Sequence, residues 1–330
     1  MHRKRTGGPP PSTAAPDLSV KVGPLRLKNP IMVASGTYGF GEEFDPVMDV
    51  GILGALIVKS VTLEPRAGNP TPRIFETASG MLNSIGLENK GIDAFEAKVL
   101  PHIRRYDTVR IVNIAGRRVE DYVELARRLD RLEGVDGIEL NLSCPNVTHG
   151  GMSFSVHPPL TREVVASVRQ ATRLPLLVKL SPNVTDVVEI ARAAAEAGAD
   201  ALTLINTLLA LGVDWRSGRP QLGGGTGGLS GPAIKPVALR MVWQVARAVD
   251  LPVIGIGGIM DAEDVCEFLC AGARAVQVGT ANFIQPDATV TILRDLPRLL
   301  QEEGIADVNA LVGRLRMPDD GPSRTESHPG

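Results

Sequence analysis

The chain has 330 residues, of which 43% are hydrophobic and 22% are charged, and its formal net charge is −2 at pH 7. This composition excludes a disordered chain and is typical of a soluble globular protein with a large core. The near-neutral charge, the lack of a basic block and the lack of an uninterrupted apolar run of 18 residues argue against partners such as nucleic acid or a membrane.

Both ends of the chain are predicted to be disordered tails. Residues 1–16 contain four prolines, two glycines and almost nothing to bury, and residues 317–330 are similar in kind. The basic N-terminus leads into a Gly/Pro-rich stretch rather than the apolar core of a signal peptide. Residues 17–316 contain no comparable linker, so we expect them to form one domain.

Within this body, short apolar runs alternate with amphipathic stretches. Eight runs have the length and apolar character of buried parallel strands: 31–35, 55–60, 110–114, 137–142, 176–180, 201–206, 253–257 and 275–279. The stretches with helical periodicity include 119–132, 162–171, 186–197, 236–249 and 261–271. The repeated alternation predicts an α/β fold, a (β/α)8 TIM barrel. A doubly wound sheet has the same local pattern and is the alternative.

Three further segments do not belong to this alternation. Residues 18–22 and 25–28 flank Gly23-Pro24, which predicts a short hairpin that would close the floor of the barrel. The connections 61–90 and 207–231 are too long for plain loops. Because long ordered loops in a compact domain are usually functional, we expect both at the barrel mouth.

Every predicted strand ends in a polar residue or a glycine turn. Active sites of barrel enzymes lie at the carboxyl ends of the strands. The residues at these ends are Ser35, Lys59, Asn113, Asn141, Lys179, Asn206, Gly257-Gly258 and Gly279-Thr280. Lysines in apolar runs need an anionic partner or a route to solvent, so Lys59 and Lys179 either bind an anion or extend to water.

The glycines that end the last two strands indicate an anion site. The runs VIGIGGI and VQVGTA each place glycine just before a predicted helix. Backbone N–H groups at such turns bind phosphate, and barrels commonly have their phosphate site after strands 7 and 8. The spacing does not match the dinucleotide fingerprint, so no Rossmann NAD site is predicted.

The cysteines differ in their surroundings. Cys144 follows the fourth strand within NLSCPN and is a candidate nucleophile or base, although a cysteine is more often a small buried hydrophobe. Cys266 and Cys270 are four residues apart on a predicted helix and are expected to pack rather than to bind a metal. An odd, sparse set of cysteines indicates a reducing, cytoplasmic location.

The long second connection contains the segment NSIGLEN, residues 83–89. Its two asparagine amides flank a glycine turn and suit recognition of a planar, polar ligand. Ordinary turn chemistry explains the same residues, because asparagine and glycine favour turns.

Ten motifs together resemble those of the class 1 dihydroorotate dehydrogenase family. In chain order they are ASGTYGFGEE, IVKSVT, NSIGLENKG, VNIAG, NLSCPN, VKLSPN, LINT, GTGGLSGPAIKP, IGIGGI and VQVGTA, and they extend over roughly residues 18–305. The resemblance implies a barrel that holds FMN at its mouth and oxidises dihydroorotate to orotate in pyrimidine biosynthesis.

The resemblance also implies a role for each matching residue. Cys144 is implied to be the base that removes the C5 proton of dihydroorotate while the C6 hydride goes to FMN. The implied substrate residues are Lys59, Asn83, Ser84, Ile85, Gly86, Leu87, Asn141, Asn206 and Thr207. The implied FMN residues are Ser35, Lys59, Ser60, Asn113, Asn141, Lys179, Ile205, Gly231, Gly257, Gly258, Gly279 and Thr280.

Within the family, NSIGLEN together with SGTYGFGEE is similar to class 1B. That class implies a homodimer bound to a partner subunit with FAD and a [2Fe-2S] cluster, a heterotetramer that passes electrons to NAD+. The N-terminal extension and Glu88, where glutamine is expected, depart from its pattern. The alternatives are a fumarate-using class 1A enzyme, another FMN-dependent dihydropyrimidine reductase, or a phosphate-binding barrel without redox chemistry.

Overall fold

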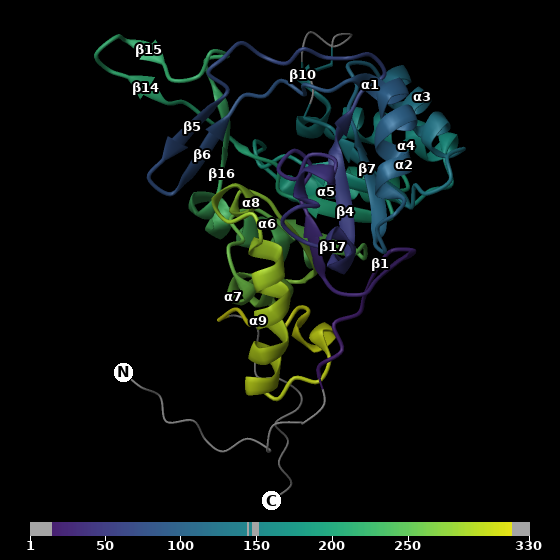
Figure 1. The fold of residues 1–330 in the computed structure, drawn as a ribbon, viewed down its shortest axis with the longest axis vertical. Coiled ribbons are helices and arrows are strands. Elements are labelled where there is room, and N and C mark those ends of the chain that lie inside the picture. The colour runs from purple at the N-terminus through teal and green to yellow at the C-terminus, as the bar shows by residue number, and fades with distance from the viewer. Residues whose placement is uncertain (1–14, 144, 147–151, 319–330) are drawn as a thin grey trace, which may run out of the picture.

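The computed structural model describes residues 15–143, 145–146 and 152–318. Eight parallel strands close into a barrel, in which each strand pairs with the next along the chain and the last with the first (Figure 1). The strands are β3 Ile31–Val33, β4 Ala55–Val61, β7 Val109–Ile114, β8 Gly137–Asn141, β11 Leu176–Leu180, β12 Ala201–Leu204, β17 Val253–Ile256 and β18 Ala273–Val278. The predicted (β/α)8 barrel is confirmed, and the doubly wound alternative is excluded because β8 pairs with β11 and β18 with β3.

Helices follow the strands and surround the barrel. They are α1 Gly91–Ala94, α2 Leu100–Ile103, α3 Val119–Leu129, α4 Pro158–Ala171, α5 Val187–Glu196, α6 Lys235–Ala246, α7 Ala262–Cys270, α8 Ala281–Ile284 and α9 Ala288–Glu302. A π-helical turn, Phe95–Val99, joins α1 to α2, and short 3-10 turns occupy Glu42–Phe44, Val50–Ile52, Phe154–Val156, Pro232–Ile234 and Val308–Leu311. None of the helices in the described ranges is long and apolar enough to span a bilayer.

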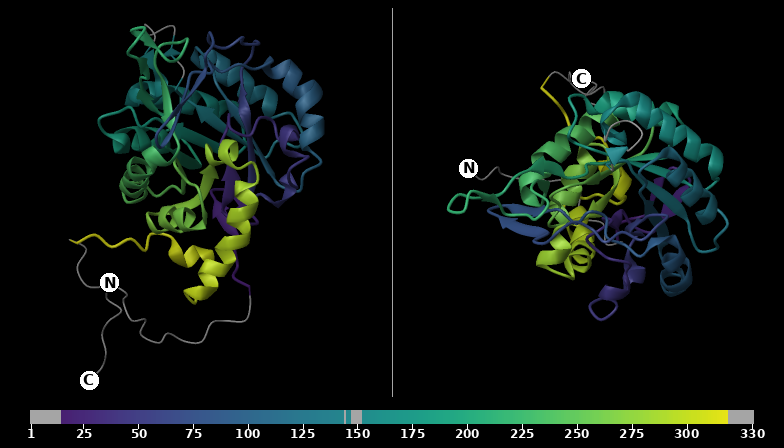
Figure 2. Two further views of the ribbon diagram at one scale, coloured as in Figure 1. Left: turned by 60° about the vertical axis from the view of Figure 1, so that its left-hand side comes forward. Right: turned by 90° about the horizontal axis from the view of Figure 1, so that it is seen from above.

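The five predicted helices are confirmed, with differences at their ends. α4 begins at Pro158, four residues before the predicted start, because proline is well tolerated in the first helical turn. α3 buries Tyr122, Leu125 and Leu129, a spacing of three and four residues that places one apolar stripe against the strands. In both views of Figure 2 the yellow α9 lies away from the green hairpin formed by β14 Val213–Asp214 and β15 Arg219–Pro220.

The predicted N-terminal hairpin is present as β1 Val20–Val22 and β2 Leu25–Leu27. Gly23 lies against Asp200, which precedes β12, and the Leu25 side chain lies near Gly137 at the start of β8. The hairpin therefore covers the amino ends of the strands, opposite the ends expected to carry chemistry.

The two long connections pair with one another, which the sequence did not predict. β5 Ile74–Thr77 and β6 Gly80–Asn83 join β13 Leu208–Ala210 and β16 Gly227–Ser230 in an antiparallel four-stranded sheet. A hairpin of β14 Val213–Asp214 and β15 Arg219–Pro220 projects beyond it (Figure 1). The remaining short pair is β9 Pro145–Asn146 with β10 Met152–Ser153. Residues 61–90 and 207–231 thus build a cover for the barrel mouth.

Candidate active site

A cavity of about 880 Å³ lies between the carboxyl ends of the barrel strands and the four-stranded sheet. Most of the residues singled out from the sequence line it. They are Ser35, Lys59, Ser60, Asn83, Ser84, Ile85, Gly86, Leu87, Asn141, Lys179, Ile205, Asn206, Thr207, Gly231, Gly257, Gly258, Gly279 and Thr280. Segments far apart in the sequence therefore converge on one cavity, while the role of each residue remains a prediction.

Among the described residues, the predicted site residue that does not line this cavity is Asn113. Asn113 is completely buried and lies beneath the cavity, where its Oδ1 accepts a hydrogen bond of 2.5 Å from Ser60 Oγ. Asn113 therefore supports the lining residue Ser60 and does not itself face the cavity. Cys144, the predicted base, lies outside the described residues.

Lys179 is the most buried charged side chain of the cavity lining. The residue is 5% exposed, which excludes the alternative that it extends to bulk water. Within the described residues, the hydrogen bond of its Nζ is a long one of 3.5 Å to Ser35 Oγ. Burial lowers the pKa of Lys179, and the negative charge of Glu139 opposes that change. A buried ammonium with so few partners suits an anionic or electron-rich ligand.

Polar side chains from neighbouring strands form a chain of hydrogen bonds along one wall. Asn141 Nδ2 donates to Ser60 Oγ at 3.4 Å, and Asn141 Oδ1 accepts from Ser143 Oγ at 2.6 Å. Asn206 Nδ2 lies 3.2 Å from Ser143 Oγ and 3.4 Å from Asn141 Oδ1. The Asn206 Oδ1 accepts the Thr207 N–H at 2.8 Å. The long contacts of Nδ2 leave this donor available to a ligand that offers a carbonyl or carboxylate.

The 83–87 segment is fixed to the rest of the cover. Asn83 Nδ2 donates to Gly228 O at 3.2 Å, and Ser84 Oγ accepts from Asn69 Nδ2 at 2.8 Å. Glu88, the residue that departs from the family pattern, pairs with Arg73 at 2.5 Å. The segment is therefore held as a rigid edge of the cavity and is more than an isolated turn.

Glycine turns close the opposite wall. Gly257, Gly258 and Gly231 have φ values of 125°, 80° and 92°. A Cβ added to Gly258 would lie 2.7 Å from Lys235 Cβ and 2.9 Å from Gly231 O, so no larger residue fits this turn. Glycine turns of this kind can present backbone N–H groups to an anion such as phosphate.

The side chain of Asp264 holds this turn in place. Its Oδ2 accepts the Met260 N–H at 2.7 Å, and its Oδ1 binds Lys235 Nζ. Asp264 and Asp261 also form a capping box at the start of α7, which satisfies backbone donors that the helix itself leaves unpaired. The glycine turn is thereby attached to a helix.

Several residues that line the cavity were not predicted from the sequence. Ser143, Ser181, Asn183, Arg66 and Arg117 line it. Ser143 and Asn183 belong to the motifs NLSCPN and VKLSPN, so their position just beyond a strand end was the available signal. Glu139, two residues before Asn141 and on the same face of β8, was visible only as a charge within an apolar run.

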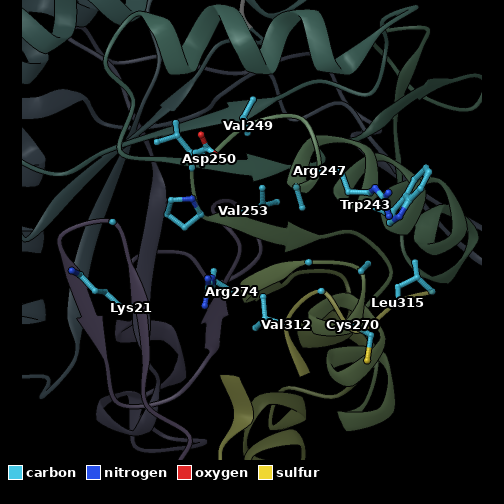
Figure 3. A pocket seen from close by; sticks show the side chains of 17 residues that line it. Lys21, Trp243, Arg247, Val249, Asp250, Val253, Cys270, Arg274, Val312 and Leu315 are labelled. Atoms are coloured by element: carbon cyan, nitrogen blue, oxygen red, sulfur yellow. The ribbon is translucent and has the colours of Figure 1, made fainter. Parts of the chain in front are cut away.

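A second cavity, of about 600 Å³, lies at the other end of the barrel (Figure 3). Lys21 of the hairpin and Trp243 of α6 lie on opposite sides of it, and Cys270 is part of its wall. Burial raises the pKa of Cys270, and it raises the pKa of Cys266 to about 11. Both thiols pack against the core and stay protonated at neutral pH. The glycine turns and asparagines described above belong to the other cavity.

Comparison with known proteins identifies close relatives. A family model described as dihydroorotate dehydrogenase matches residues 17–300. The chain is 58% identical to the protein named dihydroorotate dehydrogenase B (NAD(+)), catalytic subunit, of Geotalea uraniireducens, over 300 residues that cover 91% of this chain and 98% of that protein. Proteins of the same name from Geobacter metallireducens and Geotalea daltonii are 57% and 56% identical, over 92% of this chain and 99% and 100% of their own lengths.

Proposed function

The chain belongs to the dihydroorotate dehydrogenase family, and we propose that it oxidises (S)-dihydroorotate to orotate for pyrimidine synthesis as the catalytic subunit of an NAD+-linked enzyme. One observation carries this proposal. The barrel end brings two lysines, two asparagine amides, the 83–87 segment and the glycine turns around a single cavity. Such a cavity fits a planar, anionic pyrimidine beside a phosphorylated cofactor.

The residues present fit FMN as that cofactor. The turns at Gly231, Gly257 and Gly258 line the cavity and would hold its phosphate through their backbone N–H groups. Lys179 and Lys59 would face the ring system, where an ammonium stabilises negative charge. FMN supplies the acceptor for the hydride that leaves C6 of dihydroorotate.

The asparagine amides of the cavity would make the polar contacts to the substrate. Amides of Asn83, Asn141 and Asn206 offer donors and acceptors that match the carboxylate, carbonyl and N–H groups of the pyrimidine. The Asn83 amide is oriented by its hydrogen bond to Gly228 O. Orientation of the ring before reaction reduces the entropic barrier to proton and hydride removal.

We assign the base to Cys144, which follows Ser143 at the end of β8. A thiolate there would accept the C5 proton of dihydroorotate as the C6 hydride leaves, so that the ring loses two hydrogens and gains a double bond. Its place in the sequence, three residues after the last residue of β8 and next to Pro145, favours this role over packing. Burial raises the pKa of a thiol, as in Cys266, and would oppose formation of the thiolate.

For electron transfer to NAD+ we propose a partner subunit that contains FAD and a [2Fe-2S] cluster. An iron–sulfur cluster of this type needs four cysteine ligands, and the chain has three cysteines in total. A homodimer of this chain with two such partners is the assembly that we propose. Copurification of the chain with a cysteine-rich flavoprotein would support this assembly, and isolation of a fully NAD+-active single chain would contradict it.

The decisive experiment for the function is anaerobic titration of the purified, FMN-loaded protein. We expect a yellow protein whose flavin absorbance is bleached by dihydroorotate. Dihydrouracil lacks the carboxylate and serves as the matched comparison. Bleaching by dihydrouracil alone would favour a different dihydropyrimidine reductase, and a protein that binds no FMN would contradict the proposal altogether.

A further inference from the structure

A carboxylate lies inside the barrel beneath the cavity, and the chemistry proposed above does not use it. Glu139 of β8 is 0% exposed. Its Oε1 accepts from Asn113 Nδ2 at 2.7 Å, and its Oε2 accepts from Thr203 Oγ1 at 3.0 Å and Gln277 Nε2 at 2.6 Å. These donors come from β7, β12 and β18, so the carboxylate lies where four strands face one another.

The surroundings of Glu139 suit a carboxylate. A carboxylate only accepts hydrogen bonds, and here three donors converge on it. Gln277 turns its Nε2 to Glu139 and leaves its own buried Oε1 without a hydrogen-bond partner in the described part of the chain. Leaving that oxygen unpaired is unfavourable, and donation to a charged acceptor offsets the loss.

The charge of Glu139 acts on Lys179. In the barrel register Glu139 lies beside Leu177, and Asn141 lies beside Lys179. Because alternate residues share a face, Glu139 and Lys179 both project inward, with Lys179 one step nearer the mouth. The other charged groups that line the cavity are Lys59, Arg66, Arg117 and Glu88. Burial lowers the pKa of Lys179, and the negative charge that opposes this lowering is that of Glu139.

Glu139 also determines the direction of the hydrogen-bond chain on the wall. Since Asn113 Nδ2 donates a hydrogen bond to the carboxylate, Asn113 Oδ1 faces Ser60 and accepts a hydrogen bond from its hydroxyl. The Ser60 oxygen is then free to accept from Asn141 Nδ2, which leaves Asn141 Oδ1 as an acceptor at the mouth. A neutral side chain at position 139 would not impose this order.

We propose that Glu139 is a positioning residue, which keeps Lys179 protonated as its buried counter-charge and fixes the donor and acceptor directions of the Asn113–Ser60–Asn141 chain. The inference rests on the proposed FMN chemistry and deepens it. Glu139 touches neither of the proposed ligands, and it acts through Lys179 and Asn113.

The test measures the midpoint potential of the bound flavin in Glu139→Gln, a substitution of nearly equal volume. A neutral Lys179 stabilises the reduced, anionic flavin less, so the preference for reduced over oxidised FMN is expected to fall by about tenfold or more, which lowers the potential. If Lys179 stayed protonated, loss of the carboxylate would raise the potential instead. An unchanged or raised potential would therefore overturn the proposal.

Thr203→Val is the matched control. It removes a hydrogen bond to the same carboxylate in the same buried layer but leaves the charge in place. We expect lower thermal stability and an unchanged flavin potential. A drop in potential equal to that of Glu139→Gln would assign the effect to packing and overturn the proposal.

A double-mutant cycle on the FMN-free protein tests the charge pair without the cofactor. Glu139→Gln and Lys179→Met are each expected to lower the free energy of unfolding, and the double variant less than their sum, because it leaves neither charge unpaired. If the two losses in the free energy of unfolding were additive in the double variant, the pairing of Glu139 with Lys179 would be contradicted. If Glu139→Gln alone does not fold, Lys179→Met should restore folding, and a double variant that is also unfolded would overturn the proposal. A wild-type protein that binds no FMN would instead defeat the proposed function and leave this cycle interpretable.

Discussion

Asn141 is the residue that connects the proposed FMN site with the proposed substrate site. Its amide is linked to Ser60 on one side and to Ser143 and Asn206 on the other. A single asparagine thus connects the wall expected to face FMN with the amides expected to face the pyrimidine. Small changes at such a residue are expected to alter binding and chemistry together.

At the same scale, the role of Cys144 can be separated from flavin binding. Cys144→Ala is expected to retain FMN but to slow flavin reduction by dihydroorotate about 10²-fold to 10⁴-fold near neutral pH, the usual contribution of a positioned acid or base. Stopped-flow absorbance measures this rate. Cys266→Ala is the matched control, because Cys266 packs on α7, and it should reduce at the wild-type rate. Near-wild-type reduction in Cys144→Ala would remove it as the base.

Asn206 is expected to contribute mainly to substrate binding. Truncation in Asn206→Ala removes an amide whose Nδ2 makes only long contacts within the protein and whose Oδ1 accepts the Thr207 N–H at 2.8 Å. A lost hydrogen bond to a buried ligand group costs about 1–3 kcal/mol, so KM for dihydroorotate should rise roughly 5-fold to 100-fold. Asn309→Ala is the control, because Asn309 is a half-buried asparagine of the 3-10 turn Val308–Leu311 that hydrogen-bonds Ser19 O and does not line the cavity. An unchanged KM in Asn206→Ala would place the substrate elsewhere in the cavity.

At the scale of elements, the turn after β17 depends on its attachment to α7. Asp264 receives the backbone N–H of Met260 and also binds Lys235 at the start of α6. Two helices therefore fix the glycines that are expected to hold the FMN phosphate. This arrangement explains why the turn requires glycine at Gly258, where both φ and space exclude a side chain.

Gly258→Ala should therefore weaken FMN binding more than it weakens the fold. The left-handed conformation alone costs an alanine roughly 1–2 kcal/mol of stability. Gly304→Ala is the matched control, because Gly304 also has a positive φ of 68° but nothing lies within 4 Å of its added Cβ. We expect a similar cost of the left-handed backbone in both variants, an added steric cost in Gly258→Ala, and a loss of FMN affinity only in Gly258→Ala. Fluorescence titration measures this affinity, and equal FMN affinity in the two variants would contradict the phosphate assignment.

At the scale of the whole molecule, the two ends of the barrel are different. The hairpin of β1 and β2 covers the amino ends of the strands, and the four-stranded sheet covers the carboxyl ends. On that sheet side, the β14–β15 hairpin carries Trp215 with 75% of its surface exposed. Ligands are therefore expected to enter at the carboxyl end, where the cavity of about 880 Å³ lies.

FMN binding in this cavity should stabilise the whole barrel, since its lining comes from most of the strands. A ligand present at 100 times its Kd stabilises the native state by about 2.7 kcal/mol, and the melting temperature of the FMN-free protein should rise by several degrees. Riboflavin lacks the phosphate and is expected to give a smaller shift at the same concentration. Equal shifts in thermal unfolding would argue against a phosphate site at the glycine turns.

The sequence by itself determined the features that repeat locally. Buried parallel strands are mostly apolar, so all eight were visible, and all eight end within two residues of their predicted positions. Since carboxyl ends of parallel strands meet at one end of a barrel, the polar strand-end residues could be assigned to one cavity before any contact was known. The motif resemblance then predicted the family, which the comparisons confirm.

Tertiary structure alone decided the contacts between segments that are distant in the chain. The sheet over the mouth pairs Asn83 with Gly228 across strands of only four residues, which have no clear alternation to detect. The position of Asn113 beneath the cavity and the convergence of three donors on Glu139 depend on which strands face each other inside the barrel. Such pairings depend on barrel closure, in which side chains from four strands share one buried layer, and no local sequence pattern encodes that geometry.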